Sequence, residues 1–189
     1  TGNITDDQSE YLKKLQQIFG QKKDQQHKLK IDYSMLLDGL IDEKKQGITI
    51  DIAYKYFRIK NKNFVFIDSP GHIEYTKNMA HAASHSDVAL VIIDSSKKLS
   101  NQSKNHLKIV SAFPNIKKII VCINKLDKVF YKKEKYESIV YEVIKFAKLN
   151  NILIDNFVPI SGLRGDNVVK KSPKIKFYNG KSLLDILID

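Results

Sequence analysis

Hydrophobic residues near the start of this 189-residue chain recur at helical spacing, which predicts a surface helix over residues 7–25 and a shorter one over residues 33–40. Over residues 48–56 the apolar positions alternate with the others, as in a strand with one buried face. After a polar turn at residues 60–63 comes the apolar run 64–67. We expect the two segments to pair as a hairpin.

Later in the chain the pattern changes to continuous apolar strands over residues 88–93, 119–123 and 157–160. Strands that are apolar on both faces belong to parallel sheets covered by helices. Between the last two strands, apolar residues lie on one side of a predicted helix over residues 136–147. The sequence therefore predicts an α/β fold, a doubly wound and mostly parallel sheet with helices on both faces.

Composition narrows the picture without changing it. With 42% hydrophobic residues, a chain of this length can bury one core, so we expect one domain. The formal net charge is +11, and Arg58 and Arg164 are the only arginines, so lysine supplies the excess. Base-specific readout favours the arginine fork. We therefore interpret the lysines as solvated faces and expect no nucleic-acid partner.

The single cysteine, Cys122, lies inside the apolar run 119–123. We expect it to be a buried small hydrophobe, with no disulfide framework and no zinc spacing, in a reducing compartment. The longest apolar run, residues 88–93, is far shorter than the ~18 residues that a membrane span needs. No leader pattern is seen at the first residue. These features favour a cytoplasmic chain with no membrane partner.

Polar loops follow three of the predicted strands, and a fourth precedes the hairpin. Ligands of α/β sheets collect at the carboxyl ends of strands, so these loops form the candidate site. The four loops are Gly47-Ile48-Thr49-Ile50, Asp68-Ser69-Pro70-Gly71-His72, Asn124-Lys125-Leu126-Asp127 and Ser161-Gly162-Leu163. Each alone is typical of a polar turn after a strand, whereas four in this order indicate a shared ligand.

In this order the loops resemble those of the translation-factor class of GTPases, which implies a P-loop GTPase domain with GTP and Mg²⁺ as cofactors. The resemblance implies that Thr49 and Asp68 hold Mg²⁺, and that Ser69 and Pro70 belong to the same nucleotide-binding loop. It also implies three catalytic residues, Thr49, Gly71 and His72, of which Gly71 meets the γ-phosphate and His72 positions the attacking water. The other histidines are expected to be surface or helix residues: His27, His81, His85 and His106.

The third loop is the expected reader of the base. The carboxylate of Asp127 can accept hydrogen bonds from the N1–H and the exocyclic amine of guanine, whereas adenine offers no such pair. The resemblance implies that Asn124 and Lys125 brace this pocket. The backbone of the fourth loop, Ser161-Gly162-Leu163, would close it.

A narrower resemblance joins the chain to the large subunit of bacterial sulfate adenylyltransferase. It is carried by residues 38–40, 46–57, 71–80, 92–94 and 165–169. It implies a regulatory subunit that couples GTP hydrolysis to the formation of adenylyl sulfate from ATP and sulfate, with a small catalytic subunit as partner. One alternative is a GTPase similar to elongation factor Tu that binds aminoacyl-tRNA. Another is a nonfunctional remnant.

The phosphate cradle of such GTPases, Gly-x-x-x-x-Gly-Lys-Ser/Thr, does not occur in the sequence. Gly180-Lys181-Ser182 comes nearest, but Ile175 stands where the first glycine is required, so we expect this tripeptide to start the last helix. Residues 1–189 are therefore expected to form a partial GTPase domain without the following β-barrel domains. Its central first strand, between those ending at Asp68 and near Asp94, would be missing. We expect this chain alone to be inactive.

Overall fold

The computed structural model describes residues 51–59 and 61–189, all within one compact unit, Leu37–Asp189. The predicted helices over residues 7–25 and 33–40, and Thr49 with its loop, lie outside the described residues. The strands are β1 (Ala53–Ile59), β2 (Lys62–Asp68), β3 (Val88–Asp94), β4 (Lys118–Asn124) and β5 (Asn156–Pro159). The helices are η2 (Ile73–Tyr75), α3 (Thr76–Ser84), α4 (Asn101–Ser111), η3 (Leu126–Val129), α5 (Lys133–Leu149) and α6 (Leu183–Ile188).

The predicted hairpin is present, with β1 and β2 antiparallel and Ala53 opposite Asp68. Two details of the prediction are wrong: residues 51–52 lie outside the strand, and Tyr54 and Tyr56, on the predicted buried face, are 41% and 76% exposed. In the described part of the chain, the main packing partner of each hairpin strand is the other strand. Among the residues described, no further layer packs on this two-stranded ribbon, and such side chains are then exposed.

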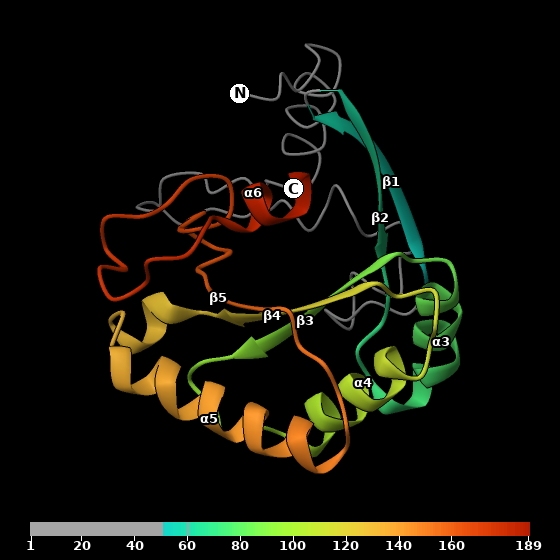
Figure 1. Ribbon diagram of the computed structural model, residues 1–189, viewed down its shortest axis with the longest axis horizontal. Helices are drawn as coiled ribbons and strands as arrows, with labels where there is room; N and C mark the ends of the chain where they lie inside the picture. Colours follow the sequence, from blue (N-terminus) through green and yellow to red (C-terminus); the bar gives the residue numbers. More distant parts are fainter. Residues whose placement is uncertain (1–50, 60) are drawn as a thin grey trace, which may run out of the picture. The chain divides into compact units, whose positions relative to one another are not determined.

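The second sheet is parallel, in the order β3-β4-β5, and confirms the α/β prediction. Its middle strand, β4, is buried on both faces, as its continuous apolar sequence predicts. Val121 and Ile123 pack with α4 and α5, whereas Ile120 and Cys122 pack with α6. Figure 1 shows α4 and α5 on one side of this sheet and α6 on the other. Cys122 is a free, buried thiol, as predicted.

The two sheets are separate within the described residues. There, β2 pairs with β1 alone and β3 pairs with β4 alone, so no backbone ladder joins β2 to β3. This is the position at which the sequence predicts a missing central strand. Each of these two strands therefore has one edge without a ladder partner among the residues described.

The last helix, α6, begins where the sequence predicts. The side chain of Ser182 caps it by accepting a hydrogen bond from the backbone N–H of Asp185 at 3.3 Å. Leu183 and Ile186 are then buried against the sheet. The tripeptide Gly180-Lys181-Ser182 is thus a helix start in this structure, which agrees with the structural interpretation of that sequence.

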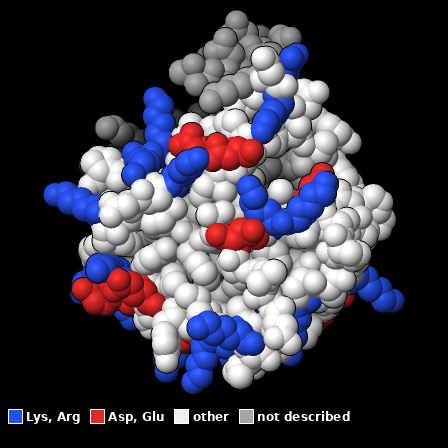
Figure 2. All heavy atoms as spheres, in the orientation of Figure 1, with Lys and Arg blue, Asp and Glu red and all other residues white. Residues whose placement is uncertain are grey.

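The basic side chains do not form one patch on the face seen in Figure 2. They lie scattered, with acidic side chains between them. Several pair locally, such as Lys117 with Asp87 and Lys133 with Glu137. No helix in the described part of the chain has the length and apolar character needed to span a bilayer.

Candidate functional site

Two of the predicted loops meet at the carboxyl ends of β4 and β5. The strand register places Asp94 beside Asn124 and Ile123 beside Pro159, so three strands end at one edge of the sheet. Backbone hydrogen bonds continue past the strands, from the Ile160 N–H to the Ile123 carbonyl at 2.8 Å. The third and fourth loops are consequently held next to each other.

The Asn124 side chain fastens these loops together. Its Oδ1 accepts hydrogen bonds from the backbone N–H groups of Lys125 at 2.7 Å and Gly162 at 2.9 Å. A Cβ added to Gly162 would lie 3.5 Å from the Asn124 amide, which is an ordinary contact, so the space at this position would also admit a small side chain. Leu163, the next residue, is 72% exposed and points no apolar surface into the core.

Asp127, the last residue of the third loop, lies in η3, where the chain has turned away from β4. Its Oδ1 accepts a hydrogen bond from the Ser161 hydroxyl at 2.6 Å, and Ser161 is fully buried. The Asp127 Oδ2 has no hydrogen-bond partner among the described residues. The carboxylate is thus oriented through Oδ1, and acceptor capacity remains on both oxygens, which suits a ligand with two neighbouring N–H donors such as guanine.

Lys125 adopts the left-handed backbone conformation, with φ 63°, and its ammonium lies 2.8 Å from Asp94 Oδ2. Partial burial would raise the pKa of Asp94, but hydrogen bonds from Lys125 and from Ser96 outweigh it and lower the pKa to about 2. The adjacent Ser95 hydroxyl is buried without a hydrogen-bond partner among the residues described. Asp94 is therefore a member of this site that the sequence analysis did not assign.

The loop after β2 forms a second group of predicted residues. Asp68 and Ser69 are half-buried, Pro70 is buried, and Gly71 and His72 are exposed. The His72 carbonyl accepts a hydrogen bond from the Tyr75 N–H at 3.0 Å, which starts η2. An exposed ring at the start of a helix can reach a ligand, and nothing in the described structure assigns it a core role.

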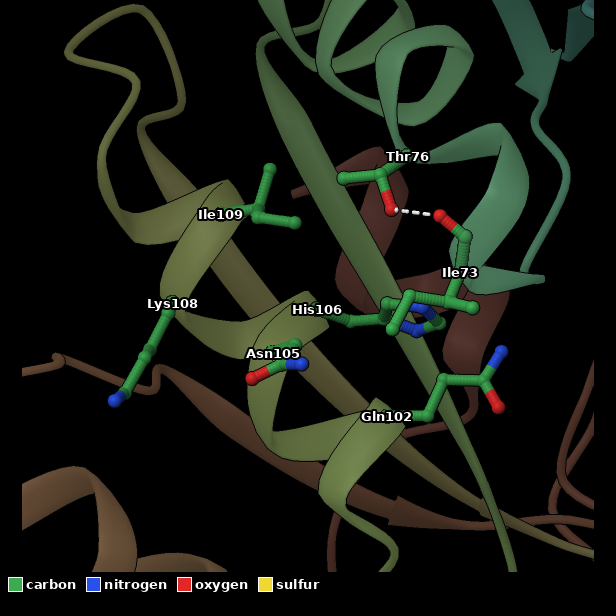
Figure 3. Close-up of a pocket in the computed structure, with 7 residues that line it drawn as sticks. All are labelled: Ile73, Thr76, Gln102, Asn105, His106, Lys108 and Ile109. Carbon is green, nitrogen blue, oxygen red and sulfur yellow. Dashed lines mark hydrogen bonds between the residues drawn. The ribbon is translucent and has the colours of Figure 1, made fainter.

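Helix α4 contacts the loop after β2 through Gln102 and His106. The Gln102 side-chain amide donates a hydrogen bond to the Gly71 carbonyl. Partial burial lowers the pKa of His106, while a hydrogen bond with the Gly71 backbone acts in the opposite direction. A pocket of about 240 Å³ lies beside this helix, and Figure 3 shows Gln102 and His106 of α4 lining it together with Ile73 and Thr76. His106, predicted to be a helix residue, does lie in a helix, but the prediction missed its contact with Gly71.

The predicted Mg²⁺ site is not tested by this geometry. Thr49 lies outside the described residues, so its distance from Asp68 is not defined. Among the residues described, no three histidine, cysteine or acidic side chains are grouped to hold a metal ion. Asp68 offers a carboxylate at the end of a strand, a ligand type that suits Mg²⁺, which commonly takes only one or two protein carboxylates.

Comparison with known proteins shows what this architecture resembles. The family model described as the elongation factor Tu GTP binding domain matches residues 9–189. Sulfate adenylyltransferase subunit 1 of Francisella tularensis subsp. tularensis (strain WY96-3418) is 46% identical over 158 residues, 84% of this chain and 33% of that protein. The subunit of the same name from Photobacterium profundum is 46% identical over 161 residues, 85% of this chain and 34% of that protein.

Solved structures give the same picture. A bacterial selenocysteine-specific elongation factor, EF-Sec, matches with a TM-score of 0.64 and 26% identity over 80% of this chain and 24% of its own. The Saccharomyces cerevisiae Ski7 GTPase-like domain has a TM-score of 0.72 and 22% identity over 97% of this chain and 43% of its own, a likeness of fold.

The present chain spans about a third of the length of the curated relatives it matches. The family model nevertheless covers all but its first residues, and the parallel sheet agrees with the fold of the solved relatives. The chain belongs to the family of elongation factor Tu GTP-binding domains.

Proposed function

We propose that this chain is the guanine-nucleotide-binding part of a sulfate adenylyltransferase regulatory subunit. The observation that carries the base-binding part of the proposal is the Asp127 carboxylate, fixed through one oxygen by buried Ser161 and flanked by Asn124 and Gly162. The similarity to relatives named sulfate adenylyltransferase subunit 1 supports the other part of the proposal, the role as a regulatory subunit of that enzyme.

The preference for guanine would arise because a wrong base leaves the Asp127 carboxylate without its hydrogen-bond donors. Asp127 accepts two hydrogen bonds from guanine, whereas adenine leaves the carboxylate without donors. A site built in this way can reject the wrong analogue by as much as ~10⁴-fold. Asn124 and Ser161 keep the carboxylate and the closing loop in place without contacting the reacting phosphates.

The loop after β2 would serve the phosphates. Asp68 and Thr49 would hold Mg²⁺, which when bound neutralises charge on the phosphate oxygens. The Gly71 N–H would donate to the γ-phosphate, and His72 would orient the attacking water. The sequence contains no phosphate cradle, so we propose that these 189 residues by themselves neither bind GTP tightly nor hydrolyse it.

Coupling to sulfate chemistry would be conformational. We propose that a separate small subunit transfers the adenylyl group from ATP to sulfate, and that the loops containing Thr49 and His72 order on GTP and relax after its hydrolysis. No residue of the present chain would then contact sulfate.

The base site can be tested without the phosphate cradle. We expect titration of the ¹⁵N-labelled chain with millimolar GMP to shift the backbone amide signals of Lys125, Asp127 and Gly162, and AMP to leave them in place. Equal shifts with both nucleotides, or GMP shifts confined to other residues, would show that these loops are not a guanine site.

A second candidate is a translation factor that binds aminoacyl-tRNA. The observation that favours it is the likeness to a selenocysteine-specific elongation factor at 26% identity. The higher identity to sulfate adenylyltransferase subunit 1, 46%, favours the first candidate.

A further inference from the structure

We propose that Asp166 and Tyr131 are positioning residues that set the geometry of the base site, acting through Ser161 and Asp127. This inference rests on the proposed guanine site and extends it to two residues that would not touch the nucleotide. It follows from a closed ring of hydrogen bonds that joins the loop after β4 to the loop after β5.

Asp166 holds the backbone of Ser161 from both sides. The Ser161 N–H donates to the Asp166 carbonyl at 3.1 Å, and the Asp166 N–H donates to the Ser161 carbonyl at 3.2 Å. Asp166 is 8% exposed, and its carboxylate accepts hydrogen bonds from the hydroxyls of Tyr131 at 2.6 Å and Ser172 at 2.7 Å. Lys174 completes the cluster at 3.5 Å.

Tyr131 connects this cluster to the segment that carries Asp127. Its backbone N–H donates to the Leu126 carbonyl at 2.9 Å, so Tyr131 closes the turn that contains Asp127. Both Phe130 and Tyr131 have φ 55°, the left-handed region that bulky residues seldom adopt. Phe130 is 82% exposed, so buried contacts of its own do not hold this conformation. The contacts that hold it are the Tyr131 hydroxyl bond to Asp166 and the backbone bonds from the Phe130 N–H to the Asp127 carbonyl at 3.4 Å and from the Tyr131 N–H to the Leu126 carbonyl.

The ring of contacts returns to the base reader. Asp127 accepts from Ser161, Ser161 pairs with Asp166, Asp166 accepts from Tyr131, and Tyr131 bonds to Leu126 beside Asp127. Loss of the Tyr131–Asp166 bond leaves the two loops joined by Asn124 and by the Asp127–Ser161 bond, so the loops stay together, but Ser161 and the carboxylate that it orients can shift as a pair. We therefore expect reduced discrimination between bases more than reduced stability.

The charges in the cluster suit this role at neutral pH. Burial would raise the pKa of Asp166, but hydrogen bonds from Tyr131 and Ser172 and the charge of Lys174 lower it, so the carboxylate stays an acceptor. Burial and the neighbouring carboxylate raise the pKa of Tyr131 to about 12, so the phenol stays a donor.

The test compares GMP with IMP, which lacks the exocyclic amine, in NMR titrations of the chain. We expect Tyr131→Phe and Asp166→Asn each to lower the preference for GMP by about tenfold, the lower end of what a hydrogen bond to a charged group is typically worth. Amide exchange at Gly162 and Leu126 should also become faster. Tyr141→Phe removes an exposed hydroxyl on α5, and Asp87→Asn an exposed carboxylate, so these matched controls should change neither measurement.

The outcomes separate the two proposals. If the wild-type chain prefers GMP and both variants keep that preference, the positioning role is wrong while the guanine site stands. If the wild-type chain shows no GMP binding at these loops, the guanine site is wrong, and amide exchange alone decides whether Asp166 and Tyr131 hold the loops. If the Asp166→Asn variant unfolds, the Tyr131→Phe variant gives the answer, because it removes only the hydroxyl and keeps the aromatic side chain.

Discussion

Asp127 is the residue on which the proposed base site depends most. Its place after a buried strand was predictable from the sequence, because polar residues at strand ends stand out from the apolar run before them. Its bond from Ser161 was not, since the two residues are 34 positions apart and meet only through the pairing of β4 with β5. The same holds for Asp94, Tyr131 and Gln102, whose partners depend on tertiary packing.

We expect Asp127→Asn to weaken GMP binding by about tenfold or more and to favour XMP. The amide presents a donor where the carboxylate accepts, which matches the second carbonyl of xanthine in place of the amine of guanine. NMR titration with both nucleotides measures the change, with Asp87→Asn as the exposed control. An unaltered preference for GMP would remove Asp127 from the role of base reader.

The Lys125–Asp94 pair predicts a pH dependence of stability. The pKa of Asp94 is about 2 in the folded chain and 3.8 as its ordinary value. The pair therefore stabilises the fold above pH 3.8, and this contribution is lost as the pH falls toward 2. We expect Lys125→Met to lower the free energy of unfolding at neutral pH, and the difference from wild type to shrink across that window.

Urea unfolding at pH 7, 5, 4 and 3 measures this difference. Lys117→Met is the control, because the Lys117–Asp87 pair is 3.4 Å long and its side chains are 77% and 79% exposed. Exposed pairs of this kind contribute little. A gap between Lys125→Met and wild type that stays constant with pH would mean that Asp94 is not the group responsible.

At the scale of elements, prediction succeeded where one period dominated the sequence. The predicted helix over residues 136–147 is the middle of α5 (Lys133–Leu149), and the apolar runs are the strands of the parallel sheet. The hairpin was predicted too, but the predicted burial of one face of its first strand was wrong, because alternation shows which residues share a face and not whether another layer covers it. Helix α4 was missed as the support of Gly71, since Gln102 and His106 belong to no motif.

Leu107 tests the packing of α4 on the sheet. It is fully buried in the core that includes Val121, so Leu107→Ala should lower the free energy of unfolding by about 2–5 kcal/mol. Leu149→Ala, at the end of α5, removes a side chain that is 77% exposed and should change it by no more than about 0.5 kcal/mol. Urea unfolding of both variants gives the comparison. Equal effects would mean that α4 does not pack as described.

For the molecule as a whole, the distribution of charge bears on whether nucleic acid is a partner. The net charge is +11, and on the face seen in Figure 2 the basic side chains lie dispersed among acidic ones. A dispersed charge favours solubility in water over a defined path for nucleic acid. This agrees with the interpretation of the lysine excess made from the sequence alone.

We therefore expect the affinity-tagged chain, recovered from its own cells at about 150 mM salt, to carry a small adenylyltransferase subunit and no tRNA. Mass spectrometry identifies the protein, and absorbance at two wavelengths reports nucleic acid. Recovery of aminoacyl-tRNA, with binding that falls steeply as salt rises, would favour the translation-factor candidate instead.

The buried thiol of Cys122 can be used to follow the opening of the parallel sheet at its middle strand, β4. Its side chain is fully inaccessible, and burial raises the pKa of its thiol to about 12. A thiol in that state resists alkylation until β4 separates from its neighbours. The rate at which an iodoacetamide reagent modifies Cys122 consequently measures how fast the sheet opens at its centre. Since the chain has a single cysteine, no other thiol has to be removed before the measurement.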